Sequence, residues 1–87
     1  MERAKSRRLT TSGRRFIVLN YIVSEPGEWT CRVIANDLGD DFHGVTEAAI
    51  SLKKKGLIVR GGKVGRSYTH LPTEAGVELL LRSLETS

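Results

Sequence analysis

A short amphipathic segment that ends in a glycine constrains the fold of this chain more than any other feature. Thr30 is a favourable helix N-cap, and the segment 31–38 after it repeats its apolar residues at helical spacing. Gly39 follows at once and supplies the left-handed residue that commonly ends a helix. The sequence therefore predicts a short helix that ends sharply at this glycine.

The segment after this turn predicts a second helix, which Asp40 or Asp41 caps and which runs to Lys55, before Gly56. Its narrow apolar stripe has i, i+4 and i+7 spacing and consists of Val45, Ala49 and Leu52. Two helices that meet across a short turn beginning with glycine form a helix-turn-helix arrangement.

The flanking segments complete a mainly α-helical domain with one small β-hairpin. Apolar spacing predicts a first helix over 13–24 and a last helix over 73–84. Between them, β-favouring residues at 57–60 and 67–71 flank the glycine-rich stretch 61–66, which predicts a hairpin with a basic tip. The expected order is helix, helix, helix, strand, wing, strand, helix.

Basic residues are concentrated in two short stretches of the chain. Residues 1–15 contain six Lys or Arg and one acid, and residues 53–66 contain six Lys or Arg and no acid. Together they hold twelve of the fourteen basic residues, although the net charge is only +4. If folding brings both stretches to one side, they form a surface suited to a polyanion; otherwise they are a solvated tail and an unrelated basic loop.

Length and composition limit the classes of function. The 87 residues suffice for one domain over 12–87, preceded by a basic arm over 1–11 that we expect to lack fixed structure. The chain contains no paired nucleophile and base, no phosphate-loop motif and no metal-ligand spacing, so the sequence predicts neither an enzyme nor a cofactor. No apolar run has the length of a membrane span or of a secretory segment, and the expected location is the cytoplasm.

Three local motifs resemble winged helix-turn-helix transcriptional regulators of the MarR, ArsR and PadR type. They are the leucine-glycine turn at 37–39, the charged stretch followed by glycine and leucine at 53–58, and the threonine-glutamate-x-glycine start of the last helix within 71–80. The resemblance covers about residues 12–84, which is nearly the whole chain. It implies a winged helix-turn-helix fold that binds double-stranded DNA.

Three positions around the turn depart from the pattern of these regulators. Asp40 occupies a turn position that is usually apolar, and Gly44 lies early in the second helix of the motif, where a helix former is more usual. Phe42 is expected at the surface, folded back onto its own helix. The same helix has no arginine at its N-terminal end.

The resemblance implies that the second helix of the motif enters the major groove and that the basic wing contacts the neighbouring backbone. His43 can then donate to a base or phosphate, Thr46 offers a hydroxyl and a methyl group, and Glu47 can accept from a cytosine amine. Each of these three is otherwise a solvent-facing helix residue. The full set of expected DNA-binding residues is Arg14, Arg15, His43, Thr46, Glu47, Lys53, Lys54, Lys63 and Arg66.

The last helix carries more apolar surface than the core of a monomer needs. Leu79 lies off the face made by the other apolar residues, which are Val77, Leu80, Leu81 and Leu84. We therefore expect a homodimer that uses Leu79, Leu80 and Leu84, and the resemblance implies the same. The sequence indicates no effector pocket, so a small-molecule effector stays open.

Two other functions remain open. The first is a winged helix that binds proteins, which Phe42, Glu47 and the acid-rich middle of the chain favour. The second is an architectural protein that binds DNA without sequence preference through its wing and arm.

Overall fold

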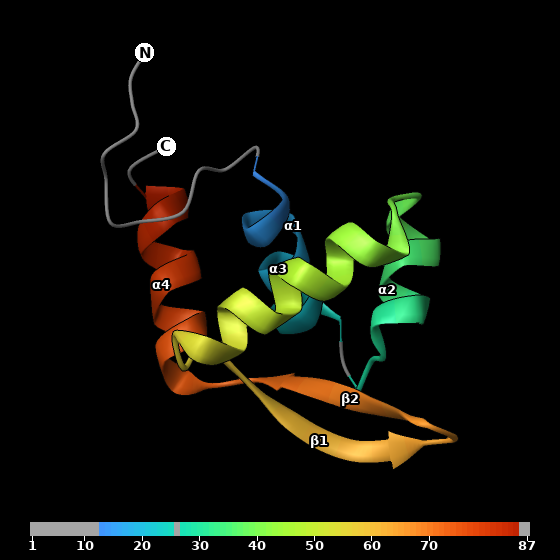
Figure 1. The fold of residues 1–87 in the computed structure, drawn as a ribbon. Coiled ribbons are helices and arrows are strands. Elements are labelled where there is room, and N and C mark those ends of the chain that lie inside the picture. Colours follow the sequence, from blue (N-terminus) through green and yellow to red (C-terminus); the bar gives the residue numbers. More distant parts are fainter. Residues whose placement is uncertain (1–12, 26, 86–87) are drawn as a thin grey trace.

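The computed structural model describes residues 13–25 and 27–85. Its elements follow the predicted order (Figure 1) and are α1 (Arg14–Ser24), α2 (Cys31–Leu38), α3 (Phe42–Lys54), β1 (Ile58–Val64), β2 (Ser67–Pro72) and α4 (Glu74–Glu85). The basic arm expected over 1–11 lies outside the described residues.

The turn between α2 and α3 is fixed by the caps that the sequence predicts. Thr30 Oγ1 accepts a hydrogen bond from the Val33 amide at 3.3 Å, which begins α2. Gly39 ends it in the left-handed region, with φ 67° and ψ 33°. Of the two possible caps for α3, Asp41 is the one used: its Oδ2 accepts from the Gly44 amide at 2.9 Å. The ends of both helices, and therefore the turn between them, are determined by residues that are close together in the sequence.

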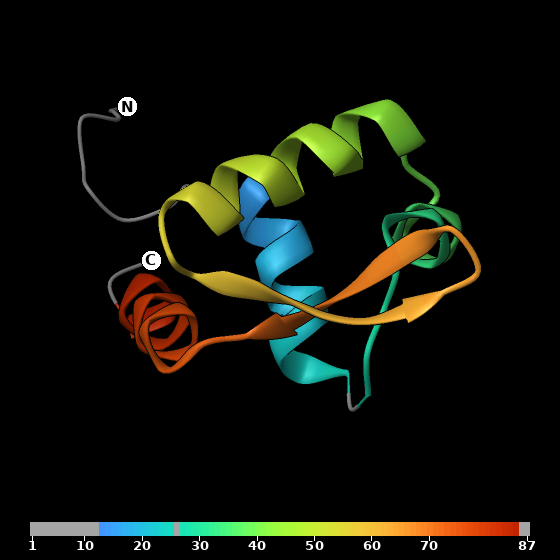
Figure 2. The ribbon, with the colours of Figure 1, turned by 60° about the horizontal axis from the view of Figure 1, so that its bottom comes forward.

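The hydrophobic core lies where α3 crosses α1, with α2 and α4 at opposite ends and the hairpin beneath them (Figures 1 and 2). The predicted stripe of α3 is buried, with at most 1% of each side chain exposed. The buried apolar residues are Phe16, Val18, Leu19, Ile22, Ile34, Ala35, Val45, Ala48, Ala49, Leu52, Leu57, Ile58 and Leu80. One core thus joins all four helices to the base of the hairpin.

The hairpin is longer than its sequence pattern predicts. β1 pairs antiparallel with β2 from Ile58 opposite Pro72 to Val64 opposite Ser67. The loop is therefore only Gly65 and Arg66, and the predicted tip over 61–66 is wrong because most of it continues β1. An isolated β-bridge pairs Trp29 with His70 along the edge of β2 that does not face β1.

The predicted core face of α4 is wrong in part. Leu80 is buried, but 55% of Leu81 and 50% of Leu84 is exposed, and Leu79 is half-buried against the core. The face that packs inward instead contains Gly76, Leu80 and Ser83. Gly76 lies against the backbone of Leu57, and this close approach sets the rotation of α4 about its axis.

Candidate nucleic-acid interface

The outer face of α3 is an exposed strip that runs the length of the helix. It consists of His43, Glu47, Ile50 and Lys54, at i, i+4, i+7 and i+11. Ile50 is absent from the predicted contacts, although it is 46% exposed and its spacing from Glu47 marks the same face. An exposed isoleucine on such a strip suits contact with an apolar group, such as the methyl group of thymine.

The polar residues of α3 make contacts within the helix. His43 Nε2 lies 3.3 Å from Glu47 Oε2, one turn along, and both side chains are largely exposed. The Thr46 hydroxyl donates to the Phe42 carbonyl at 2.8 Å, so this proton is already used. The strip therefore presents an imidazole and carboxylate pair, with the oxygen lone pairs of a half-buried threonine beside it.

The aromatic ring of Phe42 lies against α2 and not along its own helix. Arg32 Cζ lies 4.4 Å from the centroid of the ring, and 42% of Phe42 is exposed. This cation–π contact joins the beginning of α2 to the beginning of α3. The expected surface position is confirmed, and the partner of the ring is a guanidinium.

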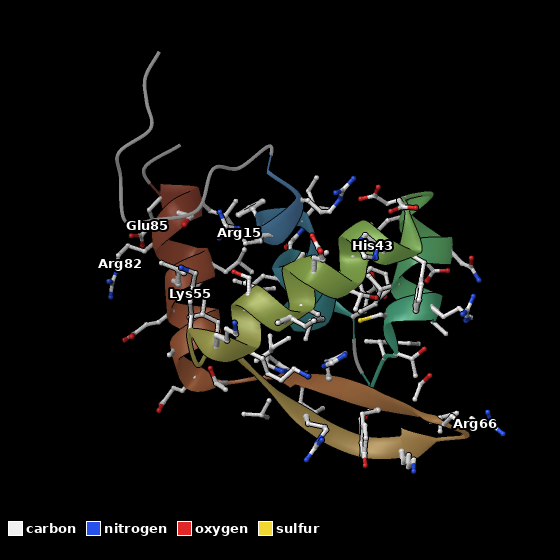
Figure 3. The ribbon with its side chains drawn as sticks, viewed as in Figure 1. Arg15, His43, Lys55, Arg66, Arg82 and Glu85 are labelled. Carbon is white, nitrogen blue, oxygen red and sulfur yellow. The ribbon has the colours of Figure 1, made fainter. Side chains whose placement is uncertain are left out.

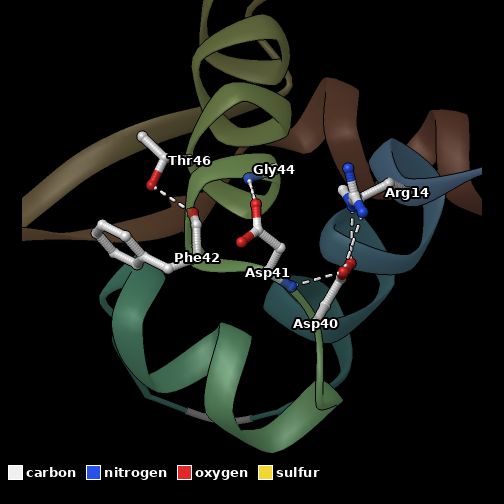
Figure 4. A network of polar contacts seen from close by, with 6 residues as sticks. All are labelled: Arg14, Asp40, Asp41, Phe42, Gly44 and Thr46. Carbon is white, nitrogen blue, oxygen red and sulfur yellow. Dashed lines mark hydrogen bonds and ion pairs between the residues drawn. The ribbon is translucent and has the colours of Figure 1, made fainter.

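The beginning of α3 is tied to α1 by an ion pair. Arg14 Nε and Nη2 donate to the two carboxylate oxygens of Asp40 at 2.7 and 3.0 Å, and Asp40 Oδ1 also accepts from the Asp41 amide at 2.7 Å (Figure 4). The pairing raises the pKa of Arg14 and lowers that of Asp40. Both charges therefore persist at neutral pH, which keeps the link intact.

This ion pair explains two of the departures from the family pattern. A Cβ on Gly44 would lie 2.3 Å from Arg14 Nη1, so the guanidinium occupies the space that an ordinary helix former would fill. Asp40 is polar because it binds that guanidinium. The predicted phosphate contact of Arg14 would have to compete with Asp40.

The other basic residues among the predicted DNA contacts lie around α3 and on the hairpin. Arg15 Nη1 donates to the Ser51 hydroxyl of α3 at 3.2 Å, Lys53 is half-buried and Lys54 is exposed. Lys63 and Arg66 are exposed on the hairpin. Figures 1 and 2 both put the tip of the hairpin at the end of the molecule where α3 begins, and Figure 3 shows Arg66 and His43 at that end. Charge from the second basic stretch thus lies at the end of the molecule where α3 begins.

A buried histidine of β2 packs the hairpin against the beginning of α2. His70 is 5% exposed, its Nε2 lies 3.4 Å from the sulfur of half-buried Cys31, and its Nδ1 has no hydrogen-bond partner. Burial, and then the charge of Lys53, lower the pKa of His70. Burial likewise raises the pKa of the Cys31 thiol. Both groups are therefore neutral at pH 7, and the contact is a packed polar pair and not an ion pair.

Folding stability is expected to fall as the pH is lowered from 7 toward 5.5. The unfolded chain takes up a proton near the ordinary histidine pKa of about 6.5, whereas folded His70 takes it up only at lower pH. Protonation therefore favours the unfolded state across this window. Thermal melting of His70→Gln should show less pH dependence than wild type across this window. Equal pH dependence in wild type and His70→Gln would contradict the assignment.

Within residues 13–25 and 27–85, no three His, Cys, Asp or Glu side chains come close enough to hold a metal ion. No helix of that part of the chain has the length and apolar character needed to cross a membrane.

The fold matches solved structures of transcriptional regulators. PcaV from Streptomyces coelicolor, solved with its natural ligand, has a TM-score of 0.77 and 26% identity, and the match covers 92% of this chain and 56% of PcaV. A MarR-family regulator from a Rhodococcus species has a TM-score of 0.74 and 24% identity, over 83% of this chain and 51% of the regulator. MepR from Staphylococcus aureus, solved in complex with DNA, has a TM-score of 0.72 and 21% identity, over 85% of this chain and 62% of MepR.

This chain thus spans between half and two thirds of the length of the regulators that it matches. No protein-family model and no curated protein sequence matches it. These three proteins, among others that match, are regulators of transcription, in agreement with the expectation that the chain is not an enzyme. The chain has the winged helix-turn-helix fold of the MarR-family transcriptional regulators, with α2 and α3 as its helix-turn-helix and the hairpin as its wing.

Proposed function

We propose that this chain binds double-stranded DNA as a transcriptional regulator, with α3 in the major groove and the wing against the neighbouring backbone. The observation that carries the proposal is the position of the basic wing tip at the end of the molecule where the exposed strip of α3 begins. A helix can enter the major groove only if its outer face is free, and phosphates beside the groove attract cations. The structural match to MepR, which was solved in complex with DNA, supports DNA as the partner.

Within this proposal, the residues of α3 read bases and the basic residues around it bind phosphates. His43 and Glu47 offer a donor and an acceptor to base edges, and Ile50 offers an apolar contact. Thr46 adds a lone-pair acceptor at the edge of the strip. Phosphate contacts come from Arg15, Lys53, Lys54, Lys63 and Arg66, and a phosphate contact of Arg14 would have to compete with Asp40.

Binding to duplex DNA can be measured by fluorescence anisotropy on a random duplex and on a sequence selected from a random pool. A regulator should prefer the selected sequence by about 10³-fold or more. If six to eight basic residues contact phosphates, the affinity should fall roughly 10³-fold or more between 50 and 200 mM salt. Equal affinity for both duplexes would instead mean an architectural protein, and no binding to either would overturn the proposal in favour of a protein-binding winged helix.

The chain is further proposed to act as a homodimer that associates through α4. Leu81 and Leu84 are the most exposed leucines of that helix, and with half-buried Val77 they form an i, i+4, i+7 stripe. Leu79 lies at the boundary of the core, while Leu80 supports the helix from inside the protomer. Isolated leucines at a surface are ordinary, but a continuous stripe of them favours association.

Sedimentation is expected to give a dimer that the double substitution Leu81→Glu/Leu84→Glu converts to a monomer. Two carboxylates in an apolar interface would have to be buried without partners, which is unfavourable by several kcal/mol as an order-of-magnitude figure. Ala75→Glu, at an exposed position on the opposite side of α4, is the matched control and should stay dimeric. A wild-type monomer at high micromolar concentration would contradict the dimer and leave the proposed DNA binding untouched.

A further inference from the structure

The wing carries a cluster of two cations and one aromatic ring, of which only Lys63 is among the predicted DNA contacts. Arg60 Cζ lies 4.3 Å and Lys63 Nζ lies 5.4 Å from the centroid of the Tyr68 ring. All three side chains are exposed. We refer to Arg60, Lys63 and Tyr68 as the wing cluster. It lies on the paired part of the hairpin, where Lys63 and Tyr68 form the pair next to the Val64–Ser67 pair that closes the loop.

A β-bulge is what brings both cations to the same ring. Side chains alternate between the two faces of a strand, so residues three apart normally lie on opposite faces. Here the pairing shifts between Arg60, which is opposite His70, and Lys63, which is opposite Tyr68. Three steps along β1 thus correspond to two steps along β2. The extra residue reverses the alternation and puts Lys63 on the face that Arg60 and Tyr68 share.

An acidic side chain from outside the hairpin holds this bulge. Glu28 Oε1 accepts hydrogen bonds from the Gly62 amide at 3.0 Å and from the Thr69 hydroxyl at 2.6 Å. These two bonds lower the pKa of Glu28, so its carboxylate is ionised at neutral pH. A Cβ on Gly61 would lie 2.7 Å from the same oxygen and 2.6 Å from Thr69 Oγ1. The bulge, its glycine and the carboxylate therefore fit one another as a unit.

We propose that the wing cluster is a second contact with the sugar-phosphate backbone of duplex DNA, and that Glu28 is a positioning residue that maintains it through the bulge. The proposal rests on the duplex binding proposed above. Long cationic side chains lose rotamer freedom when they bind phosphate, and a ring that already restrains both of them reduces that loss. The Glu28 carboxylate thus favours binding to a polyanion, although it carries the same sign of charge.

Substitutions at Glu28 test this inference because electrostatics alone predicts the opposite sign. Removing an acid near DNA should raise affinity, whereas Glu28→Ala is expected to lower affinity for a duplex roughly 3- to 10-fold through the loss of both cation–π contacts. Glu28→Gln keeps an oxygen that can accept both hydrogen bonds and removes the charge, so its affinity should equal or exceed that of wild type. Glu25→Ala, an exposed acid just after α1, is the matched control and should not weaken binding.

Tyr68 gives a second and independent measurement. Tyr68→Phe keeps the ring and should bind as wild type does, whereas Tyr68→Leu should lose affinity as Glu28→Ala does and show a shallower salt dependence. Arg60→Gln should reduce the slope of log affinity against log salt by about 0.9, which is the value for one phosphate contact. Circular dichroism and melting of each variant separate a local change in the wing from unfolding.

The outcomes separate this inference from the proposed function. Wild-type binding to duplex that Glu28→Ala, Tyr68→Leu and Arg60→Gln all leave unchanged would overturn the wing cluster alone. Absence of duplex binding by wild type would overturn both. A loss in Tyr68→Phe equal to that in Tyr68→Leu would assign the effect to the hydroxyl and would also overturn the role of the ring.

Discussion

Gly76→Ala is expected to destabilise the protein by about 2–4 kcal/mol, which corresponds to a fall in melting temperature of roughly 10–30 °C for a domain of this size. An alanine Cβ at this position would lie 2.1 Å from the carbonyl oxygen of Leu57 and 3.0 Å from its carbonyl carbon. Both atoms belong to the backbone, which cannot rotate away as the end of a side chain can. The first turn of α4 would have to move off the core.

The surrounding hydrogen bonds add to this cost. The Thr73 hydroxyl donates to the Gly56 carbonyl at 2.7 Å and accepts from the Gly76 amide at 3.0 Å, and the Thr73 amide donates to Leu57 at 3.1 Å. These bonds join the end of α3 to the beginning of α4 through a single residue. A shift of α4 would strain all three hydrogen bonds of Thr73 at once, so the protein cannot accommodate the alanine by a small movement of the helix.

Gly62→Ala is the matched control for Gly76→Ala. Its Cβ would lie 3.5 Å from Glu28 Oε1, which is ordinary contact, and its φ is not in the left-handed region. We expect a change in unfolding free energy within about 0.5 kcal/mol. Chemical denaturation of wild type and both variants measures the difference. A Gly76→Ala protein as stable as the control would show that α4 does not pack on Leu57 at this distance.

The double substitution Lys63→Gln/Arg66→Gln is expected to weaken binding to a DNA duplex roughly 10- to 100-fold near 0.1 M salt. Each phosphate contact contributes about 0.9 to the slope of log affinity against log salt, so losing two should reduce the slope by about 1.8. Both side chains are exposed on the wing, and their removal should leave folding stability unchanged. The effect should be the same on every duplex sequence, because phosphates carry no sequence information.

Arg82→Gln is the control for a general effect of charge. Arg82 lies on α4, at the opposite side of the molecule from Arg66 (Figure 3). Its Nη2 lies 3.9 Å from Oε1 of Glu78, one turn before it on the same helix. Its substitution should change the salt slope little. Anisotropy titrations at four or more salt concentrations provide the slopes. An unchanged slope in the Lys63→Gln/Arg66→Gln variant would remove the wing from the DNA interface.

Much of the fold was predictable because its signals are local. Thr30, Gly39 and Asp41 begin and end helices through bonds to residues at most four positions away, so the sequence alone contains both the cap and the group that it caps. The stripe of α3 is likewise set by the helical period, and all its members are buried. The order of elements and the winged fold follow from such short-range rules.

Other features depend on which residues meet across the fold, and no local rule contains them. Asp40 and Gly44 depart from the family pattern in sequence because Arg14, 26 residues before Asp40, fills the space between them. The sequence marks Leu79 as the surplus leucine of α4, but contact of Gly76 with Leu57 rotates that helix so that Leu81 and Leu84 face outward.

In the wing, some features follow from the local sequence and others from contacts with distant residues. Its charge and its glycines are visible in the sequence, which therefore determined that a basic hairpin follows the helix-turn-helix. Its register was decided only by tertiary structure, because Glu28 lies 34 residues before the amide that it binds. A shift of one residue reverses the face of every side chain beyond it. Local propensity thus fixes that the elements exist, while long-range packing and hydrogen bonding fix which of their faces reach a partner.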